Sequence, residues 1–134
     1  MQVMAIDPGD VHVGVARAAN GRVWAEEINA TDFLPWFSDR VHELKVVVIE
    51  EFRLYPGSAP ALSWSPMRTV EMIGAIRWIA ACAGVPIALQ SAAVKVPTRA
   101  QCKARGIVWK HKSGHASDAL LHLYYFMLRN KMEV

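Results

Sequence analysis

Two acidic residues follow apolar segments that lie far apart in the sequence. Asp7 follows residues 2–6, and Glu50 follows residues 45–49, which include four consecutive β-branched residues. If both segments are parallel strands of one sheet, their carboxyl ends lie at the same edge, where ligands usually bind. Two carboxylates placed there repel each other unless they share a cation or a proton, or are screened by water. Each also has a simpler interpretation: Asp7 is a typical turn residue, and Glu50 or its neighbour Glu51 can end a strand in solvent.

The last apolar segment adds a third acid and two histidines on one side of a predicted helix. His115, Asp118 and His122 are three and four residues apart, so they share one helix face. The simpler interpretations are that His115 caps the helix or lies on the surface, and that Asp118 is an acid favoured near a helix N-terminus. His122 is expected to pack inside the protein or to meet solvent. A zinc site made of these three residues is disfavoured, because zinc needs closer ligand geometry and supporting hydrogen bonds around its ligands.

The order of the predicted elements indicates an α/β fold in which an antiparallel hairpin adjoins parallel strands. Asn20-Gly21 separates two alternating segments and is typical of a tight hairpin turn. The apolar segment before Glu50 is typical of a central strand that is covered on both faces. We therefore expect five strands, over residues 2–6, 11–17, 22–28, 45–50 and 85–89.

Two predicted helices lie between these strands. Thr31 and Asp32 are expected to cap the first helix, with Pro35 in its first turn. Ser65, followed by proline, is expected to cap a long second helix that ends at Gly84.

The C-terminal part of the chain is predicted to end in a third helix. This helix covers residues 115–129, with Ser113 as its cap. Residues 91–114 are basic and weakly periodic, so a short helix at most is expected there, inside a mobile segment. Residues 52–64 hold two prolines and a glycine and are predicted to form a loop.

Positive charge is concentrated in the second half of the chain. The protein has 15 Lys and Arg and 12 Asp and Glu, a formal net charge of +3. Residues 72–117 contain seven of the basic residues and no acidic residue. This stretch is interpreted either as a solvated basic surface or as a face that binds phosphates.

Length and composition indicate a single globular domain over residues 1–134. The chain is 53% hydrophobic and 20% charged, which excludes disorder, collagen and a coiled coil for the whole chain. Cys82 and Cys102 lack the spacing of metal ligands, which favours a reducing compartment. No signal sequence or membrane-spanning segment is evident, so we expect a cytoplasmic protein with no membrane partner.

Three motifs occur in an order that is typical of one nuclease family. They are Ile6-Asp7-Pro8-Gly9 followed by Gly14, then Ile49-Glu50 at the end of an apolar strand, and GHASDAL over residues 114–120. Together they resemble the motifs of RuvC-type Holliday junction resolvases. The resemblance implies a ribonuclease H-like fold, with a five-stranded mixed sheet, an antiparallel hairpin and flanking helices. It also implies a homodimer and suggests a compact, phage-encoded protein in the host cytoplasm.

The resemblance assigns the catalytic and metal-binding roles to Asp7, Glu50, His115 and Asp118, with Mg²⁺ as cofactor and Mn²⁺ as a substitute. The implied reaction is the nicking of four-way DNA junctions by two-metal phosphodiester hydrolysis. Asp7 is expected to bridge both ions, while Glu50 and Asp118 each complete one site. His115 is expected either to ligate the second ion or to hold the attacking water.

Branched DNA is the partner that the resemblance implies. An aromatic residue just after the fourth strand is expected to stack on an unpaired junction base, and basic residues after the fifth strand are expected to contact phosphates. The expected DNA-binding residues are Phe52, Arg53, Tyr55, Lys95, Arg99, Lys103, Arg105, Lys110 and Lys112.

Three other functions remain open at this point. The first is a ribonuclease H-like nuclease that cuts forks, flaps or RNA–DNA hybrids. The second is a fragment of an actin-like ATPase or sugar kinase, although the chain is too short for the two lobes that close over a nucleotide. The third is a non-catalytic DNA-binding module in which the acids are structural.

Overall fold

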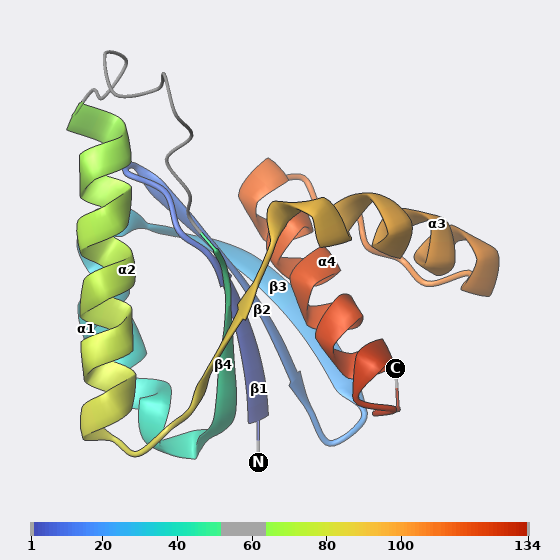
Figure 1. Ribbon diagram of the computed structural model, residues 1–134, viewed down its shortest axis with the longest axis horizontal. Helices are drawn as coiled ribbons and strands as arrows, with labels where there is room; N and C mark the ends of the chain where they lie inside the picture. The colour runs from blue at the N-terminus through green and yellow to red at the C-terminus, as the bar shows by residue number, and fades with distance from the viewer. Residues whose placement is uncertain (1, 52–63, 134) are drawn as a thin grey trace.

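A five-stranded mixed sheet forms the centre of the protein (Figure 1). The structure is a computed structural model that describes residues 2–51 and 64–133. The strand order is β3-β2-β1-β4-β5; β2 is antiparallel to β1 and β3, whereas β1, β4 and β5 are parallel. The strands are β1 (Gln2–Asp7), β2 (His12–Ala19), β3 (Arg22–Asn29), β4 (Leu44–Glu50) and β5 (Ile87–Gln90). The predicted α/β fold, with its antiparallel hairpin at one edge, is confirmed.

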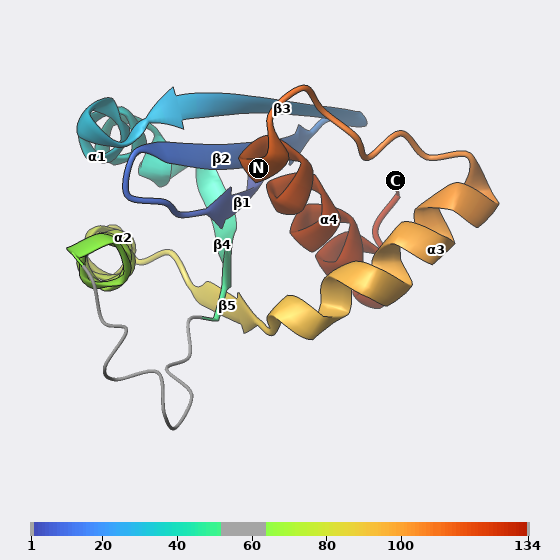
Figure 2. The same cartoon turned by 90° about the horizontal axis from the view of Figure 1, so that it is seen from above.

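Helices cover both faces of this sheet (Figures 1 and 2). One face carries α1 (Ala30–Arg40) and α2 (Trp64–Cys82), and the other carries α4 (Gly114–Arg129). A further helix, α3 (Lys95–Arg105), packs against α4 and extends away from the sheet (Figure 2). Within residues 2–51 and 64–133, no helix combines the length and the apolar character needed to cross a bilayer.

The alternation of side chains along β1 directs Asp7 toward α4. Met4 and Ile6 belong to the core on the side of α1 and α2, whereas Val3 and Ala5 belong to the core on the side of α4. Successive side chains of a strand point to opposite faces, so Asp7 continues the series of Val3 and Ala5. The first acid therefore faces the helix that carries Asp118.

The two neighbouring parallel strands repeat this pattern at the same edge. Val46 and Val48 of β4 and Ala88 of β5 pack in the core on the α4 side. The same alternation places Glu50 and Gln90, which are cross-strand partners at the ends of their strands, on that face as well. Three adjacent strand ends thus present polar side chains to α4.

Gly14 allows the start of α4 to lie directly on β2. A Cβ atom at this position would be 2.0 Å from the carbonyl oxygen of His115 and 2.7 Å from the amide nitrogen of Ala116. Such distances are far below van der Waals contact, so only glycine permits this approach. Gly14 in β2 therefore allows His115 to lie close to the sheet.

The hairpin turn is confirmed, but the predicted start of the first helix is wrong. Asn20 and Gly21 have φ values of 52° and 74°, as a tight hairpin turn requires. Helix α1 begins at Ala30, before Thr31 and Asp32, and its N-cap makes no side-chain hydrogen bond. Its start is fixed instead by the backbone hydrogen bond from Ala30 N to Val11 O, 2.8 Å long.

Because α1 starts early, Pro35 lies inside the helix rather than in its first turn. Helix α2 likewise begins at Trp64, so Ser65 does not precede it as a cap. Its predicted end is confirmed, since Gly84 adopts a left-handed φ of 72° two residues after the helix ends. The fifth strand begins later than expected, at Ile87, because Val85 N still bonds to Ala80 O of the helix end.

The basic segment contains a longer helix than its sequence indicated. Helix α3 has 11 residues, although only a short helix was expected. Pro97 is its third residue, in the first turn, where a missing N–H leaves no helical hydrogen bond unmade. Thr98 and Cys102 are buried against α4, and Gly106 ends the helix with a φ of 68°. Tertiary packing thus stabilises a helix that weak periodicity did not reveal.

Candidate active site

The three predicted carboxylates meet at the edge where β1 and β4 end. Ile6 pairs with Ile49 in the parallel ladder, so Asp7 and Glu50 leave the sheet side by side. Asp118 lies in the second turn of α4, which rests on the same face of the sheet. These residues come from three elements separated by more than forty residues, and the fold brings them together as the sequence predicted.

Asp7 is the most buried acid of the group and is held by His115. The residue is 8% exposed, and His115 Nδ1–H donates a 2.9 Å hydrogen bond to Asp7 Oδ2. Burial raises the pKa of Asp7 from 3.8 to about 6, and the charges of Asp118 and Glu50 add to this effect, while the His115 hydrogen bond opposes it. The residues around ionised Asp7 therefore provide too little positive charge to offset the cost of its burial.

Lys95 lies between the other two acids. Its Nζ atom is 3.3 Å from Glu50 Oε1 and 3.3 Å from Asp118 Oδ2. Burial lowers the pKa of Lys95, but the two carboxylates outweigh it, so the pKa lies above its usual range. The ammonium group is thus a built-in counter-ion for Glu50 and Asp118. Sequence reasoning placed Lys95 on the DNA surface and missed this position.

Glu50 has a second partner on the side away from Lys95. His122 is fully buried, and its Nε2 atom lies 3.6 Å from Glu50 Oε2. His122 and then Lys95 hold the pKa of Glu50 below its usual range, against the opposing effect of burial. Glu50 makes both contacts, which favours it over Glu51 as the acid of this group.

The donor chemistry of the site suits a hard divalent cation. Within residues 2–51 and 64–133, no three His, Cys, Asp or Glu side chains have the spacing of a formed metal site. Three carboxylates nevertheless converge, and oxygen is the donor that Mg²⁺ prefers. One of these acids, Asp7, has a raised pKa that a nearby cation would lower. The residues therefore fit Mg²⁺, provided that Lys95 leaves Glu50 and Asp118.

The site opens to the surface through a cavity of about 440 Å³. Asp7, Glu50 and His115 line it, together with Gly9 and Asp10 of the loop after β1. A side chain at Gly9 would collide with His12 O at 2.3 Å and crowd the His115 ring at 3.2 Å. The loop therefore leaves room for a substrate group beside Asp7.

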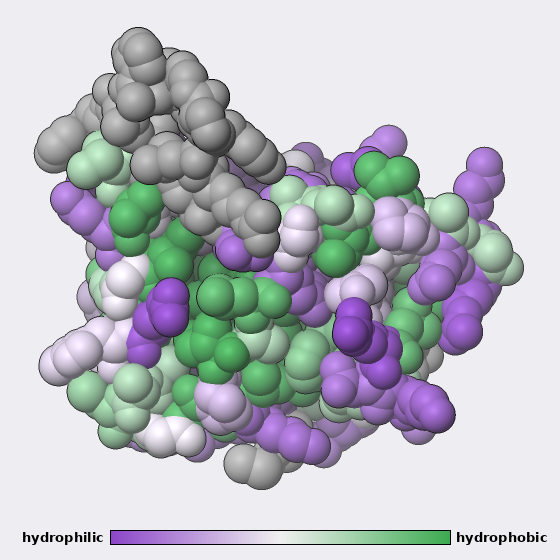
Figure 3. Space-filling model, viewed as in Figure 1, coloured by the Kyte–Doolittle hydropathy of each residue, from purple (hydrophilic) through white to green (hydrophobic). Residues whose placement is uncertain are grey.

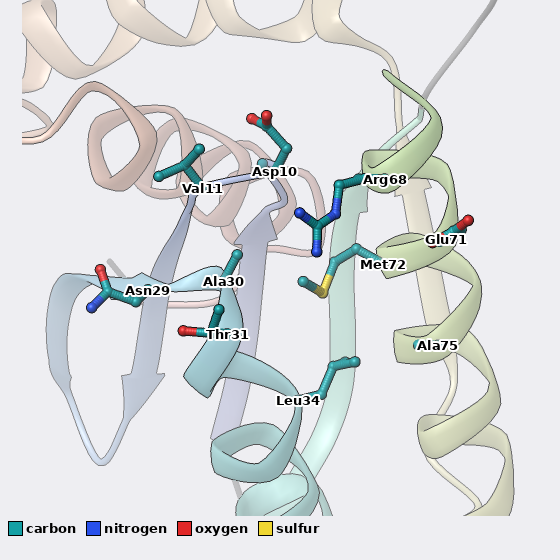
Figure 4. A pocket seen from close by; sticks show the side chains of 11 residues that line it. Asp10, Val11, Asn29, Ala30, Thr31, Leu34, Arg68, Glu71, Met72 and Ala75 are labelled. Atoms are coloured by element: carbon teal, nitrogen blue, oxygen red, sulfur yellow. The ribbon is translucent and has the colours of Figure 1, made fainter. Parts of the chain in front are cut away.

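A larger cavity of about 630 Å³ lies next to the site, between α1, α2 and the same loop (Figure 4). Leu34 and Met72 point into it, while Arg68 extends from α2 toward Asp10 (Figure 4). Its lining is mostly apolar, and it does not include Asp7 or the other converging acids. Size alone therefore does not identify the reactive centre.

Comparisons with known proteins support the fold. No protein-family model matches the chain, and a search of curated proteins finds no relative. Among solved structures, the chain is similar to Thermus thermophilus RuvC in complex with a Holliday junction substrate, with a TM-score of 0.64 and 21% identity over 97% of this chain and 96% of that one. A second Thermus thermophilus RuvC structure gives a TM-score of 0.63 and 20% identity over 98% of both chains. This chain has a RuvC-like fold.

A weaker likeness is to YeaZ from Pseudomonas aeruginosa, with a TM-score of 0.53 and 15% identity over 79% of this chain and 52% of that one. The RuvC-like match covers almost the whole of both chains, so it describes the fold better. At these identities, the comparisons show the arrangement of helices and strands, which is the predicted ribonuclease H-like one.

The predicted DNA-binding residues fall into three groups in the RuvC-like fold. Phe52, Arg53 and Tyr55 lie outside the described residues. Lys95 lies in the acidic site. The other five are exposed and belong to α3 or to the segment between α3 and α4: Arg99, Lys103, Arg105, Lys110 and Lys112.

Two residues that sequence reasoning did not connect complete the surroundings of Glu50. Gln90 Nε2 lies 3.0 Å from both His122 Nδ1 and the His122 carbonyl oxygen. The signal for His122 was its place one turn after Asp118 on the same helix face. No such feature of the sequence pointed to Gln90, because the sheet face on which its side chain lies depends on where the fifth strand begins.

Proposed function

We propose that this protein is a metal-dependent endonuclease that nicks branched DNA, with four-way junctions as its preferred substrate. The observation that carries the proposal is the convergence of Asp7, Glu50 and Asp118 from three separate elements of a RuvC-like fold. A carboxylate cluster of this kind is suited to phosphodiester hydrolysis, in which hard cations offset the charge of the phosphate.

Each residue of the site has a distinct task in this proposal. Asp7, Glu50 and Asp118 would hold Mg²⁺ or Mn²⁺, which when bound activates water and stabilises the leaving oxygen. His115 is the candidate for holding the attacking water. Its Nδ1–H is bound to Asp7, so Nε2 is the ring atom that can accept a proton from that water. Lys95, once released by the acids, can bind a phosphate oxygen.

The surface of α3 supplies the charge that brings DNA to an acidic site. Arg99, Lys103 and Arg105 are exposed on α3, and Figure 3 shows hydrophilic surface gathered over this helix. Their positive field attracts the phosphate backbone without reading sequence. The Thermus thermophilus RuvC structure with a Holliday junction substrate supports a branched duplex as the partner. Branch selectivity would come from shape and flexibility rather than from base contacts.

A homodimer is the second part of the proposal, because two matched nicks in a two-fold junction need two active sites. Apolar side chains of α2 and β5 are exposed, with Val70 at 42%, Trp78 at 69% and Leu89 at 45%. Figure 3 shows apolar surface gathered over α2 and β5. Trp78→Glu is therefore expected to give a monomer in light scattering after gel filtration, with wild type as a dimer. A wild type that stays monomeric at high concentration would exclude this interface.

The nuclease is tested with a labelled synthetic four-way junction, in Mg²⁺ and in EDTA. Wild type is expected to give paired nicks only with the cation, while Asp7→Asn binds the junction and does not cut it. Competition with unlabelled fork, flap and RNA–DNA hybrid substrates then shows which duplex form is preferred. Cutting by Asp7→Asn at the wild-type rate would remove Asp7 from the reaction.

A non-catalytic DNA-binding module is the second candidate, and the position of Lys95 favours it. An ammonium group between Glu50 and Asp118 satisfies both acids without a metal ion. In that case neither Mg²⁺ nor Mn²⁺ changes the thermal unfolding of the protein, since a ligand stabilises a fold only by binding it. The nuclease instead requires a rise in melting temperature with cation concentration, and its loss in Asp7→Asn.

A further inference from the structure

A buried imidazole behind Glu50 has no task in the proposed reaction. His122 is 0% exposed and lies on the face of α4 that packs against the sheet. A buried polar ring is costly unless hydrogen bonds replace those it loses to water. The partners of His122 therefore indicate why a histidine stands at this position.

Gln90 determines which ring nitrogen of His122 accepts a hydrogen bond. Its carboxamide lies 3.0 Å from the carbonyl oxygen of His122, which can only accept, so the amide must turn its NH₂ group toward that atom. The same NH₂ group lies 3.0 Å from His122 Nδ1 and can only donate to it. Nδ1 is therefore the unprotonated acceptor, and the ring proton is on Nε2.

The proton on Nε2 points at the acidic site. Glu50 Oε2 is 3.6 Å from Nε2, longer than an ordinary hydrogen bond, and no described residue makes a hydrogen bond to this buried nitrogen. The other oxygen of Glu50, Oε1, faces Lys95. The Glu50 carboxylate thus lies between the Nε2–H group of His122 and the ammonium group of Lys95.

Resting on the proposed nuclease function, we infer that Gln90 and His122 are positioning residues that orient Glu50 for the divalent cation. The chain of contacts runs from the Gln90 amide to His122 Nδ1, through the ring, and from Nε2–H to Glu50 Oε2. The ring contacts one carboxylate oxygen, Oε2, and the other, Oε1, would be open to the cation once Lys95 leaves it. Groups that hold a metal ligand in this way change metal affinity by about 10–100-fold when they are lost.

Two variants of His122 separate this role from simple packing. In Asn the amide group takes roughly the place of Nδ1, whereas in Gln it takes roughly the place of Nε2. His122→Gln therefore keeps a donor toward Glu50, and His122→Asn keeps only the link to Gln90. We expect His122→Gln to bind Mn²⁺ within about threefold of wild type, and His122→Asn to bind it about 10–100-fold more weakly.

Mn²⁺ binding is measured on the full-length protein by calorimetry or by the loss of the free-ion resonance signal, with no DNA present. Thermal unfolding in EDTA checks that both variants fold. Equal binding by His122→Asn and wild type, or equal weakening in both variants, would overturn the role of His122 while leaving the nuclease intact. A wild type that binds no Mn²⁺ would overturn the proposed function, and this inference with it.

The ring proton provides a test that needs no variant of His122. Long-range ¹H–¹⁵N spectra of the wild type are expected to show the ring proton of His122 on Nε2. In Gln90→Leu the preference for that tautomer is expected to weaken, because the donor to Nδ1 is gone. A wild-type ring protonated on Nδ1 contradicts the inference, as does an unchanged tautomer in Gln90→Leu.

Discussion

Replacement of Asp7 by asparagine is expected to stabilise the metal-free protein while it abolishes cleavage. Burial raises the pKa of Asp7 from 3.8 to about 6, so the folded protein binds this proton more tightly than the unfolded chain does. Stability therefore falls as the pH rises through this range, and the full penalty is present above about pH 6. At about 1.4 kcal/mol per pH unit, the penalty is about 3 kcal/mol.

Asparagine removes the charge but keeps the shape of the side chain. The hydrogen bond from His115 Nδ1–H, which is 2.9 Å long, then reaches a neutral amide oxygen instead of a carboxylate and is weaker, so part of the gain is offset. We expect Asp7→Asn to be about 1–3 kcal/mol more stable than wild type at pH 7.5 in EDTA. At pH 3 the difference should largely vanish, because the wild-type carboxyl group is then mostly protonated in both the folded and the unfolded state.

Urea unfolding at both pH values, with and without Mg²⁺, measures this difference. The lowered pKa of Glu50 contributes a loss of stability as the pH falls, but this term occurs in both proteins and largely cancels in the comparison. With Mg²⁺ the order is expected to reverse, because only wild type gains from the cation. An Asp7→Asn variant that is no more stable at pH 7.5 than wild type, or equally shifted at both pH values, would refute the reasoning.

Three other predictions follow from the contacts. Gly14→Ala should destabilise the protein by about 3 kcal/mol, because its Cβ would lie 2.0 Å from a backbone oxygen. Gly74→Ala, at a helical site where no atom of the described residues lies within 4 Å of the new Cβ, should instead raise the free energy of unfolding by about 1 kcal/mol in the same urea assay. Lys103→Ala should weaken junction binding and reduce the salt slope by about one in a filter-binding titration, while Lys45→Ala at the far end of β4 leaves the slope unchanged. Lys95→Met should lower metal-free stability by about 2 kcal/mol and tighten Mn²⁺ binding in calorimetry; weaker Mn²⁺ binding would contradict this.

The convergence of the acids could be predicted because it depends on local rules. Asp7 and Glu50 end apolar segments that only a buried parallel sheet accommodates, and parallel strands share their carboxyl edge. The position of Asp118 could be predicted from helix periodicity. A helix that buries Leu120 and Leu123 must place residue 118 near the sheet edge or in solvent. These inferences need no knowledge of long-range packing beyond the strand order.

The partners of the acids could not be predicted, because they depend on where β5 and α3 begin. The sequence favoured a strand over residues 85–89, which leaves Gln90 outside the sheet; the observed strand ends at Gln90 and turns it toward His122. Lys95 reaches the acids because α3 starts at that residue, and weak helical periodicity gave no indication of this start. Boundaries shifted by one or two residues thus decide which side chains surround the site.

Acidic and basic residues that are separated along the sequence come into contact in the fold. The removal of one acid and the removal of one lysine are therefore expected to change stability in opposite directions. Acids at the ends of β1 and β4 meet the first residue of the basic segment's helix, so Lys95 neutralises Glu50 and Asp118 but leaves Asp7 with the hydrogen bond from His115. Removal of the under-compensated acid should therefore stabilise the metal-free protein, and removal of the shared cation should destabilise it. A divalent ion supplies the charge that Asp7 lacks and competes with the charge that Lys95 already provides. If both variants shift stability in the same direction, local charge balance does not govern this site.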